Sequence, residues 1–283
     1  MTPFAIAGIQ MNVQAADNLI EIERQLAMLV FRFPWVKMAV FSELAVAGPD
    51  PALAVATGSE TELKLCELAK HYGLWLIPGS HFEKVEDRIY NTSLVINPEG
   101  VIVSRYHKMF PFMPYETGVT AGSEFCVFDV PNVGRFGLSI CYDAWFPETS
   151  RTLTALGAEV IIHPTLTGTI DRDIELANAV ATAALNQCYF VDINGLLAGG
   201  NGRSIIVDPA GKIMHQAGEI DQIIPIEIDL DQVRRQRTKG IMGGLGQPLK
   251  SFRDRAVDFS VYQDGFNNDY LNSLGPLQKA SRE

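Results

Sequence analysis

The chain contains a long internal repeat, and this feature restricts its fold more than any other. Buried strands, helices and a hairpin follow in the same order, β-α-β-α-β-β-β, in each half of the sequence. One matching hairpin could arise by chance, but four matching elements in one order indicate a duplicated structural unit. The matching pairs are FAIAGI (4–9) with FGLSIC (136–141), KMAVFSEL (37–44) with AEVIIHPTL (158–166), LWLIPGS (74–80) with CYFVDIN (188–194), and LVINPEGVIVSRY (94–106) with SIIVDPAGKIMHQ (204–216).

Helices are expected between the strands of both halves. Residues 18–32 carry apolar side chains at helical spacing, with Asp17 as the expected N-cap. Residues 61–72 form a second helix, which Gly73 ends at a C′ position. The matching gaps of the second half predict helices over 147–157 and 173–187.

A sheet with helices on one face must bury its other face against something else. Two sheets packed face to face, each covered outside by its own pair of helices, satisfy this requirement for both halves. The sequence therefore predicts an α/β fold of one domain, a four-layer α-β-β-α sandwich with pseudo-two-fold symmetry. This domain is expected to span residues 1–237.

The pattern changes after residue 237. Residues 238–283 are rich in Gly, Asn and Asp and show little periodicity. Aromatic side chains in this extension are costly to leave in water, so we expect it to pack on the body or on a partner subunit. These aromatic residues are Phe252, Phe259, Tyr262, Phe266 and Tyr270.

Composition excludes several classes of protein. The 33 acidic and 23 basic side chains give a net charge of −10, which argues against nucleic acid or an anionic membrane as the main partner. No apolar run approaches the roughly 18 residues that a membrane span needs. The first residues, MTPFAIAGIQMNVQ, lack a basic segment and read as a core strand rather than a signal peptide. Four scattered cysteines without a C-x-x-C pair suggest reduced thiols, and we expect a cytoplasmic protein.

Three polar residues fall where strands are predicted to end, which is where ligands gather in α/β folds. Glu43 follows one strand, Lys108 closes the first hairpin, and Cys141 ends FGLSIC just before a helix opened by Pro147. A sharp turn from strand to helix is the kind of position that presents a nucleophile. The other cysteines are expected to be small buried hydrophobic residues: Cys66, Cys126 and Cys188.

A cysteine nucleophile needs a base, because only a few per cent of a free thiol is ionised at neutral pH. Spacing alone allows His107 or His163 to serve. It equally allows a carboxylate base with a lysine: Glu43 at the end of an apolar strand, where desolvation raises its pKa, and Lys108 to counter an oxyanion.

Three motifs resemble those of the nitrilase superfamily, the carbon–nitrogen hydrolases. SEL (42–44), HKMFPFMPYE (107–116) and SICYDAWFPETSR (139–151) are similar to its Glu, Lys and Cys motifs and occur in the same order. NQCYFVDIN (186–194) and GRSIIVDPAG (202–211) also look like later blocks of the family. The resemblance covers roughly residues 4 to 230. FSEL replaces a commoner Pro-Glu, and Trp145 stands where many members have Arg. These departures bear on the subfamily and not on the class of reaction.

The resemblance implies the same sandwich and assigns roles to four residues. Glu43 would be the general base, Lys108 the oxyanion stabiliser and Cys141 the nucleophile. Glu116 matches a second glutamate that positions the substrate and the lysine. Family members commonly associate, so a homodimer or larger homo-oligomer is expected. Neither a metal-ligand spacing nor a phosphate-binding loop is present in the sequence, and no cofactor is expected.

The expected reaction is hydrolysis of a small amide to a carboxylic acid and ammonia through a thioester on the cysteine. Nearby loops supply the candidate pocket residues, namely Tyr115, Tyr142, Trp145, Thr165 and Leu166. Bulky aromatic side chains favour a small acyl group. A substrate carboxylate would call for arginine, and Arg151 and Arg172 are near in sequence.

Other interpretations remain open. N-carbamoyl compounds or nitriles could be cleaved by the same residues. A Cys–His hydrolase would use His107 or His163 as the base, and Glu43 would then be dispensable. A non-catalytic interaction module on the same scaffold would leave Cys141 unreactive toward substrate.

Overall fold

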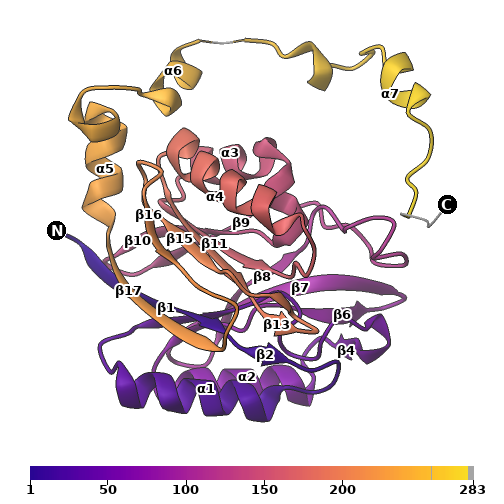
Figure 1. Ribbon diagram of the computed structural model, residues 1–283, viewed down its shortest axis with the longest axis vertical. Coiled ribbons are helices and arrows are strands. Elements are labelled where there is room, and N and C mark those ends of the chain that lie inside the picture. The colour runs from indigo at the N-terminus through magenta and orange to yellow at the C-terminus, as the bar shows by residue number, and fades with distance from the viewer. Residues whose placement is uncertain (256, 280–283) are drawn as a thin grey trace.

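The computed structural model describes residues 1–255 and 257–279 and contains two large sheets packed face to face (Figure 1). The first sheet has the order β17-β1-β3-β5-β7-β6-β4, with β8 paired to β7. Its strands are β17 (Gln222–Asp229), β1 (Pro3–Gln10), β3 (Met38–Phe41), β5 (Trp75–Ile77), β7 (Arg88–Ile96), β6 (His81–Val85), β4 (Val55–Ala56) and β8 (Ile102–His107).

The second sheet has the order β16-β15-β12-β11-β10-β9. Its strands are β16 (Ile213–Gln216), β15 (Ile205–Val207), β12 (Tyr189–Asn194), β11 (Val160–Thr165), β10 (Gly134–Leu138) and β9 (Cys126–Val130). A small third sheet joins β14 (Gly200–Asn201), β13 (Leu196–Leu197) and β2 (Asn12–Val13).

The predicted repeat is present in three dimensions. The neighbouring strands β1-β3-β5-β7-β8 of the first sheet correspond to β10-β11-β12-β15-β16 of the second. In each sheet an antiparallel strand flanks the first repeat strand: β17 beside β1, and β9 beside β10. Strand β17 was not predicted, because it lies outside the repeated pattern that revealed the others, and for β9 only the position of Cys126 on a strand was expected.

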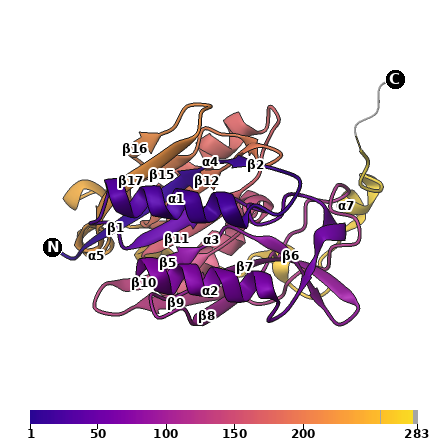
Figure 2. The same ribbon diagram turned by 90° about the horizontal axis from the view of Figure 1, so that it is seen from below.

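Four helices cover the two outer faces, as the sandwich requires (Figure 1). Helices α1 (Leu19–Arg32) and α2 (Glu60–Tyr72) pack on the first sheet, and Figure 2 shows them side by side. Helices α3 (Pro147–Ala155) and α4 (Arg172–Asn186) pack on the second sheet. All four lie close to the predicted ranges.

The space between the sheets is filled by apolar side chains from both halves. Phe4 of β1 and Phe136 of β10 meet there with ring centroids 5.6 Å apart. Both side chains are buried, as are the Ile and Val side chains around them. Burial of each such side chain stabilises the fold by roughly 1.5–3 kcal/mol, so this layer holds the two sheets together.

Of the two helix ends predicted from single residues, one is confirmed and one differs. Gly73 ends α2 with φ 62°, a left-handed conformation that glycine adopts without strain. The N-cap of α1 is Asn18, not Asp17. Asp17 accepts a hydrogen bond from the backbone N–H of Leu19 at 2.8 Å. The Asn18 side chain instead forms two hydrogen bonds with the backbone of Gln14, before the helix.

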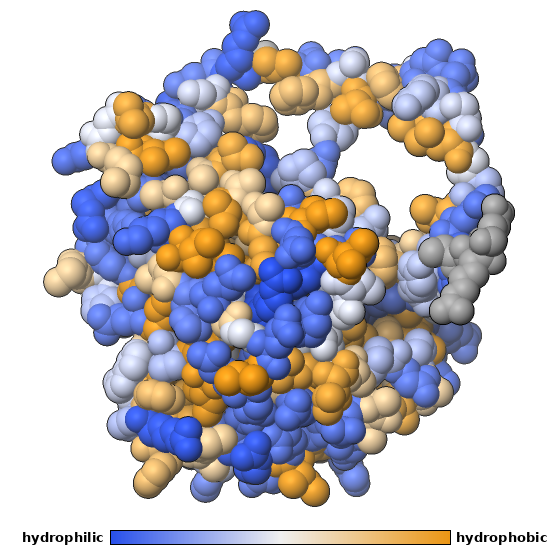
Figure 3. Space-filling model, in the orientation of Figure 1, coloured by the Kyte–Doolittle hydropathy of each residue, from blue (hydrophilic) through white to orange (hydrophobic). Residues whose placement is uncertain are grey.

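The chain beyond the sandwich begins with α5 (Leu230–Lys239), which crosses the expected domain boundary at residue 237. Short helical segments follow, and the extension curves away from the body so that open space separates the two (Figures 1 and 3). It touches α3 through a hydrogen bond from the Tyr262 hydroxyl to Glu148 and through Phe252, whose ring lies 5.5 Å from the Arg151 guanidinium. The segments are η3 (Ile241–Gly243), α6 (Pro248–Asp254), η4 (Ser260–Tyr262) and α7 (Asp269–Ser273).

Within the described residues, none of the helices has the length and apolar character to cross a bilayer.

Candidate active site

The ends of several strands bring the predicted residues to one place between the sheets. Glu43 follows β3, Lys108 follows β8, and Cys141 begins η2 (Cys141–Trp145) after β10. The backbone N–H of Glu43 donates to the carbonyl oxygen of Thr165 at 3.1 Å, which joins the end of β3 to the end of β11. The duplicated topology therefore explains why residues far apart in sequence meet.

The Lys108 ammonium lies between two carboxylates. Its Nζ is 2.8 Å from Glu43 Oε1 and 2.7 Å from Glu116 Oε2. The Lys108 side chain is only 2% exposed, so both contacts are made in a setting with little water. Asn91 on β7 donates from Nδ2 to the same two groups, at 2.8 Å to Glu43 Oε1 and 3.1 Å to Glu116 Oε1. Two carboxylates, one ammonium and one amide thus form a connected cluster.

Burial sets the protonation state of this cluster. Burial raises the pKa of Glu43, and the Glu116 charge adds to this, while Lys108 and Cys141 oppose it. Burial alone would lower the pKa of Lys108, but the surrounding acidic groups raise it above its ordinary value. Burial and the Glu43 charge raise the pKa of the Cys141 thiol well above its ordinary value. The resting cysteine is therefore a protonated thiol, and a carboxylate with a raised pKa is suited to accept its proton.

Cys141 occupies a strained turn. Its φ is 45°, a left-handed conformation that costs a non-glycine residue about 1–3 kcal/mol. The buried Asp143 carboxylate holds this turn by accepting the backbone N–H of Ile140 at 2.8 Å and the Tyr106 hydroxyl at 2.7 Å. It also accepts the backbone N–H of Phe110 at 2.8 Å, so one side chain links the cysteine turn to the segment after Lys108.

The cysteine opens to a cavity of about 310 Å³. Four of the five predicted pocket residues line it, and the fifth, Thr165, does not. Thr165 is buried beneath the cavity because it ends β11, and its carbonyl oxygen bonds Glu43. The lining residues are Phe112, Tyr115, Cys141, Tyr142, Trp145, Leu166, Thr167, Gly168, Thr169, Asp171 and Glu175.

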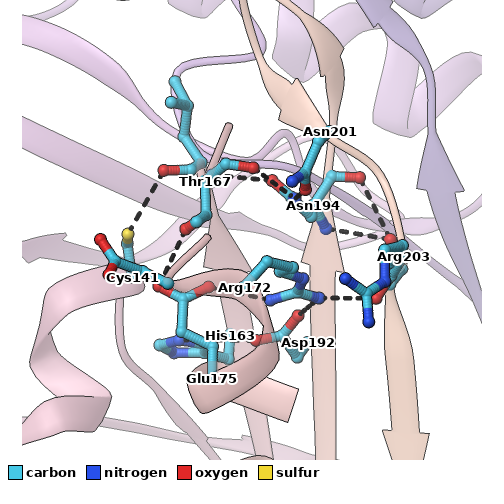
Figure 4. Close-up of polar contacts among 12 residues, drawn as sticks. Cys141, His163, Thr167, Arg172, Glu175, Asp192, Asn194, Asn201 and Arg203 are labelled. Atoms are coloured by element: carbon cyan, nitrogen blue, oxygen red, sulfur yellow. Dashed lines mark hydrogen bonds and ion pairs between the residues drawn. The ribbon is translucent and has the colours of Figure 1, made fainter. Parts of the chain in front are cut away.

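Glu175, which the sequence analysis did not identify, enters the cavity from α4. Its Oε1 accepts from Thr167 Oγ1 at 2.8 Å, and its Oε2 accepts from Arg172 Nη1 at 3.1 Å (Figure 4). Arg172 continues the chain of contacts to Asp192 Oδ1 at 2.5 Å. The sequence offered one signal for this residue: Arg172 and Glu175 lie together in the first turn of a predicted helix.

The arginines considered as carboxylate receptors are otherwise engaged. The Arg172 side chain is 0% exposed and donates to Glu175, Asp192 and the Arg203 carbonyl oxygen. Arg151 donates to the Leu185 carbonyl oxygen and lies over Phe252, outside the cavity lining.

The histidines have partners other than the thiol. His107 Nε2 lies 3.2 Å from Glu83 Oε2, and its ring stacks on Tyr90. His163 Nδ1 lies 2.8 Å from Ser139 Oγ, and burial lowers its pKa to about 4. A neutral, hydrogen-bonded His163 is a weak base, so the carboxylate is better placed than either histidine.

Two of the other three cysteines are buried as predicted, whereas Cys66 is only half-buried. Cys126 and Cys188 are buried, and burial raises their thiol pKa values to about 11 and about 12. Cys66 lies on α2. None of the three lines the cavity.

No group of three or more His, Cys, Asp or Glu side chains in the described part of the chain is arranged to hold a metal ion.

The sequence and the fold match a known family. A model of the family described as carbon-nitrogen hydrolase matches residues 5–238, and this chain belongs to that family. The family resemblance expected from the three motifs is thereby confirmed.

Individual relatives agree with this assignment. The chain is 31% identical over 233 residues to 2-oxoglutaramate amidase of Bacillus subtilis (strain 168), covering 78% of this chain and 85% of the relative. It is 30% identical over 265 residues to deaminated glutathione amidase of Synechocystis sp. (strain PCC 6803 / GT-S), covering 84% and 96%. The crystal structure of Saccharomyces cerevisiae Nit3, a member of branch 10 of the nitrilase superfamily, is similar with a TM-score of 0.78 and 26% identity, covering 84% of this chain and 94% of that chain.

Proposed function

We propose that this protein hydrolyses small amides to a carboxylic acid and ammonia through a thioester on Cys141. The observation that carries the proposal is the Lys108 ammonium held between Glu43 and Glu116, beside a cysteine that opens to a cavity. Relatives named as amidases support the reaction class.

In the first half of the reaction Glu43 accepts the thiol proton while the Cys141 sulfur attacks the amide carbon. The carbonyl oxygen becomes an oxyanion, which Lys108 and the backbone N–H of Tyr142 stabilise. When the C–N bond breaks, Glu43 returns the proton to the leaving nitrogen. Ammonia departs, and the acyl group remains on sulfur.

In the second half a water molecule attacks the thioester. Glu43 accepts a proton from this water and returns it to the sulfur as the C–S bond breaks, so the carboxylic acid leaves and the thiol is restored. Glu116 holds the Lys108 ammonium in place and helps to position the substrate. Every proton moves between groups of this chain, the substrate and water, so the cycle needs no cofactor.

A small amide fits the site better than a bulky one, since aromatic rings surround the nucleophile. Tyr142 lies with its ring centroid 6.0 Å from that of Trp145 and 4.9 Å from that of Phe112. N-carbamoyl compounds and nitriles are alternative substrates, because the same residues would cleave them.

Ammonia release from a panel of amides, ureido acids and nitriles tests the proposal. Wild type should release ammonia from at least one short amide, and Cys141→Ala should release none. Cys66→Ala is the matched control and should retain activity, because Cys66 lies outside the cavity. A wild type inert on every compound would refute the amidase assignment and favour a non-catalytic module. A Cys141→Ala variant as fast as wild type would refute the mechanism.

We also propose that residues 1–237 form the hydrolase domain and that the extension from 238 packs on a second copy of the chain, giving a homodimer or larger homo-oligomer. The support is the exposure of large apolar side chains along it, among them Phe252, Phe259, Tyr262 and Tyr270. Light scattering on the full chain should give a mass of at least two chains. A mass of one chain would contradict the proposal.

Four free cysteines support a cytoplasmic location.

A further inference from the structure

We infer that the active-site cavity selects amides that carry a positive charge at the end remote from the amide group, with Glu175 as the residue that recognises this charge. The inference rests on the proposed amidase function and specifies its substrate class. It follows from the charged residues that line the cavity, from the charges of the residues that contact them, and from an aromatic ring of the lining that contacts a cation of the chain.

The lining of the cavity is acidic. Its charged residues are Asp171 and Glu175, and no Lys, Arg or His lies among the described lining residues. Asp171 is half-buried and accepts a hydrogen bond from Thr169 Oγ1 at 3.1 Å. The other described lining residues are uncharged, so the charges that a substrate meets on these lining side chains are the two carboxylates.

The Glu175 carboxylate has capacity for another donor. Its side chain is 11% exposed, and each oxygen accepts one hydrogen bond, from Thr167 or from Arg172. A carboxylate offers about four acceptor sites, so roughly two remain for a ligand. An ammonium group, with three donors, would use them.

The neighbouring arginine does not neutralise Glu175 completely. Arg172 pairs with both Glu175 and Asp192, so one positive charge is shared by two carboxylates. His163, which lies 3.8 Å from Asp192, adds no charge at neutral pH, because burial lowers its pKa to about 4. Burial and the Asp192 charge raise the pKa of Glu175 while the Arg172 charge opposes them, so the ionised form of Glu175 is only partly compensated and would be favoured by a further cation in the cavity.

The catalytic cluster has the same imbalance. Lys108 stands between Glu43 and Glu116, so two carboxylates again share one ammonium. A substrate carboxylate would face both clusters with no cation among the described lining residues to receive it, whereas an ammonium would be attracted by both.

The aromatic wall also suits a cation, and the chain shows this directly. Lys279 of the extension places its Nζ 5.7 Å from the centroid of the Tyr115 ring. This distance lies within the roughly 6 Å over which cation–π attraction is effective. Tyr115 lines the cavity and stacks on Phe112 with centroids 5.0 Å apart. This contact shows that the face of an aromatic ring in the lining is open to a cation.

Three amides of matched length separate charge from size. 5-Aminopentanamide, hexanamide and adipic acid monoamide share a stem of four methylene groups and end in an ammonium, a methyl and a carboxylate group. Wild type should hydrolyse the ammonium compound with kcat/KM about tenfold or more above that of hexanamide, and the carboxylate compound most slowly. A kcat/KM for hexanamide or the carboxylate compound equal to or above that of the ammonium compound would overturn the inference.

Variants locate the selectivity. Glu175→Gln should reduce the ratio of kcat/KM for 5-aminopentanamide to that for hexanamide about tenfold. Asp173→Asn is the matched control: Asp173 lies on the same helix, is 75% exposed and is not part of the cavity lining, so the ratio should not change. If Glu175→Gln does not fold, Asp171→Asn serves instead and should reduce the ratio in the same direction. An unchanged ratio in the folded variants would refute the role of these carboxylates.

Binding separates failure of the inference from failure of the proposed function. Calorimetric titration of Cys141→Ala with the same three amides should give the tightest binding for the ammonium compound, whether or not wild type turns it over. Tight, charge-selective binding without turnover would refute the amidase function and uphold the selectivity. Turnover of all three amides with equal affinities would uphold the function and refute the selectivity.

Discussion

The Asn91 side chain donates a hydrogen bond from Nδ2 to Glu43 Oε1 at 2.8 Å, from the middle of β7 and with no exposure to solvent. The same nitrogen reaches Glu116 Oε1 at 3.1 Å. One neutral amide thus holds two carboxylates at the same ammonium. In the proposed reaction we therefore expect Asn91 to be a positioning residue, which acts through Glu43 and Glu116.

Replacing Asn91 with Ala should lower kcat/KM about 10- to 100-fold, because a hydrogen bond to a charged group contributes roughly 1.5–3 kcal/mol. The loss of a donor to the ionised form should also raise the pKa of Glu43 further above its ordinary value. The acidic limb of the kcat/KM profile should then move to higher pH.

Ser93→Ala is the control for this experiment. Ser93 lies on the same strand, is buried and donates to the Gly79 carbonyl oxygen at 2.6 Å, away from the carboxylates. It should leave the acidic limb in place. An Asn91→Ala enzyme whose limb does not move, even with a lower kcat, would show that Asn91 only supports the fold.

Replacing Glu43 with Gln tests which group is the base. If Glu43 accepts the thiol proton, amide hydrolysis should fall by about 10²- to 10⁴-fold. His107→Gln should retain most activity, because His107 bonds Glu83 and does not line the cavity. The reverse pattern in ammonia-release assays would establish a Cys–His pair instead.

The same Glu43→Gln variant should make Cys141 more reactive toward iodoacetamide. The Glu43 charge raises the pKa of the Cys141 thiol, so its removal should lower that pKa and increase the thiolate fraction beside Lys108. Mass spectrometry of the alkylated peptide across pH should place its labelling midpoint at lower pH than in wild type. A midpoint at the same or higher pH would mean that the two side chains are not coupled.

Much of the sandwich could be predicted because apolar segments recur in the same order in both halves of the sequence. The strands and helices of both halves lie near their expected ranges. Glu43, Lys108 and Cys141, predicted at strand ends, lie together because strand ends in such a fold converge. Flanking strands such as β17 were missed, since QIIPIEID (222–229) contains a proline and has no counterpart in the repeated unit. Edge strands tolerate proline, and their pairing depends on neighbours that are distant in sequence.

The supporting side chains of the site could not be predicted in the same way. Asn91 and Asp143 make hydrogen bonds to residues distant in sequence, and nothing in their own segments shows which partners they reach. Glu175 reaches the cavity only because α4 packs beside η2. Thr165 was expected in the pocket, but only its neighbour Leu166 lines the cavity, since sequence position alone does not show which side chain turns inward.

The buried Asp143 should make stability depend on pH in a defined direction. Burial raises its pKa from 3.8 to about 6 in the folded state. Between these values the folded state binds more protons than the unfolded state, so this residue contributes stability below pH 4 that is lost as pH rises to 6. At about 1.4 kcal/mol per pKa unit, the contribution amounts to about 3 kcal/mol.

Denaturant unfolding of wild type and Asp143→Asn from pH 3.5 to 7 measures this contribution, because asparagine does not titrate. The free energy of unfolding of wild type minus that of the variant should fall through this window and stay level above pH 6. Tyr106→Phe removes a donor that favours the ionised form, so it should raise the pKa of Asp143 and extend the fall to higher pH. A difference that is constant, or that rises with pH, would show that folding does not raise the pKa of Asp143.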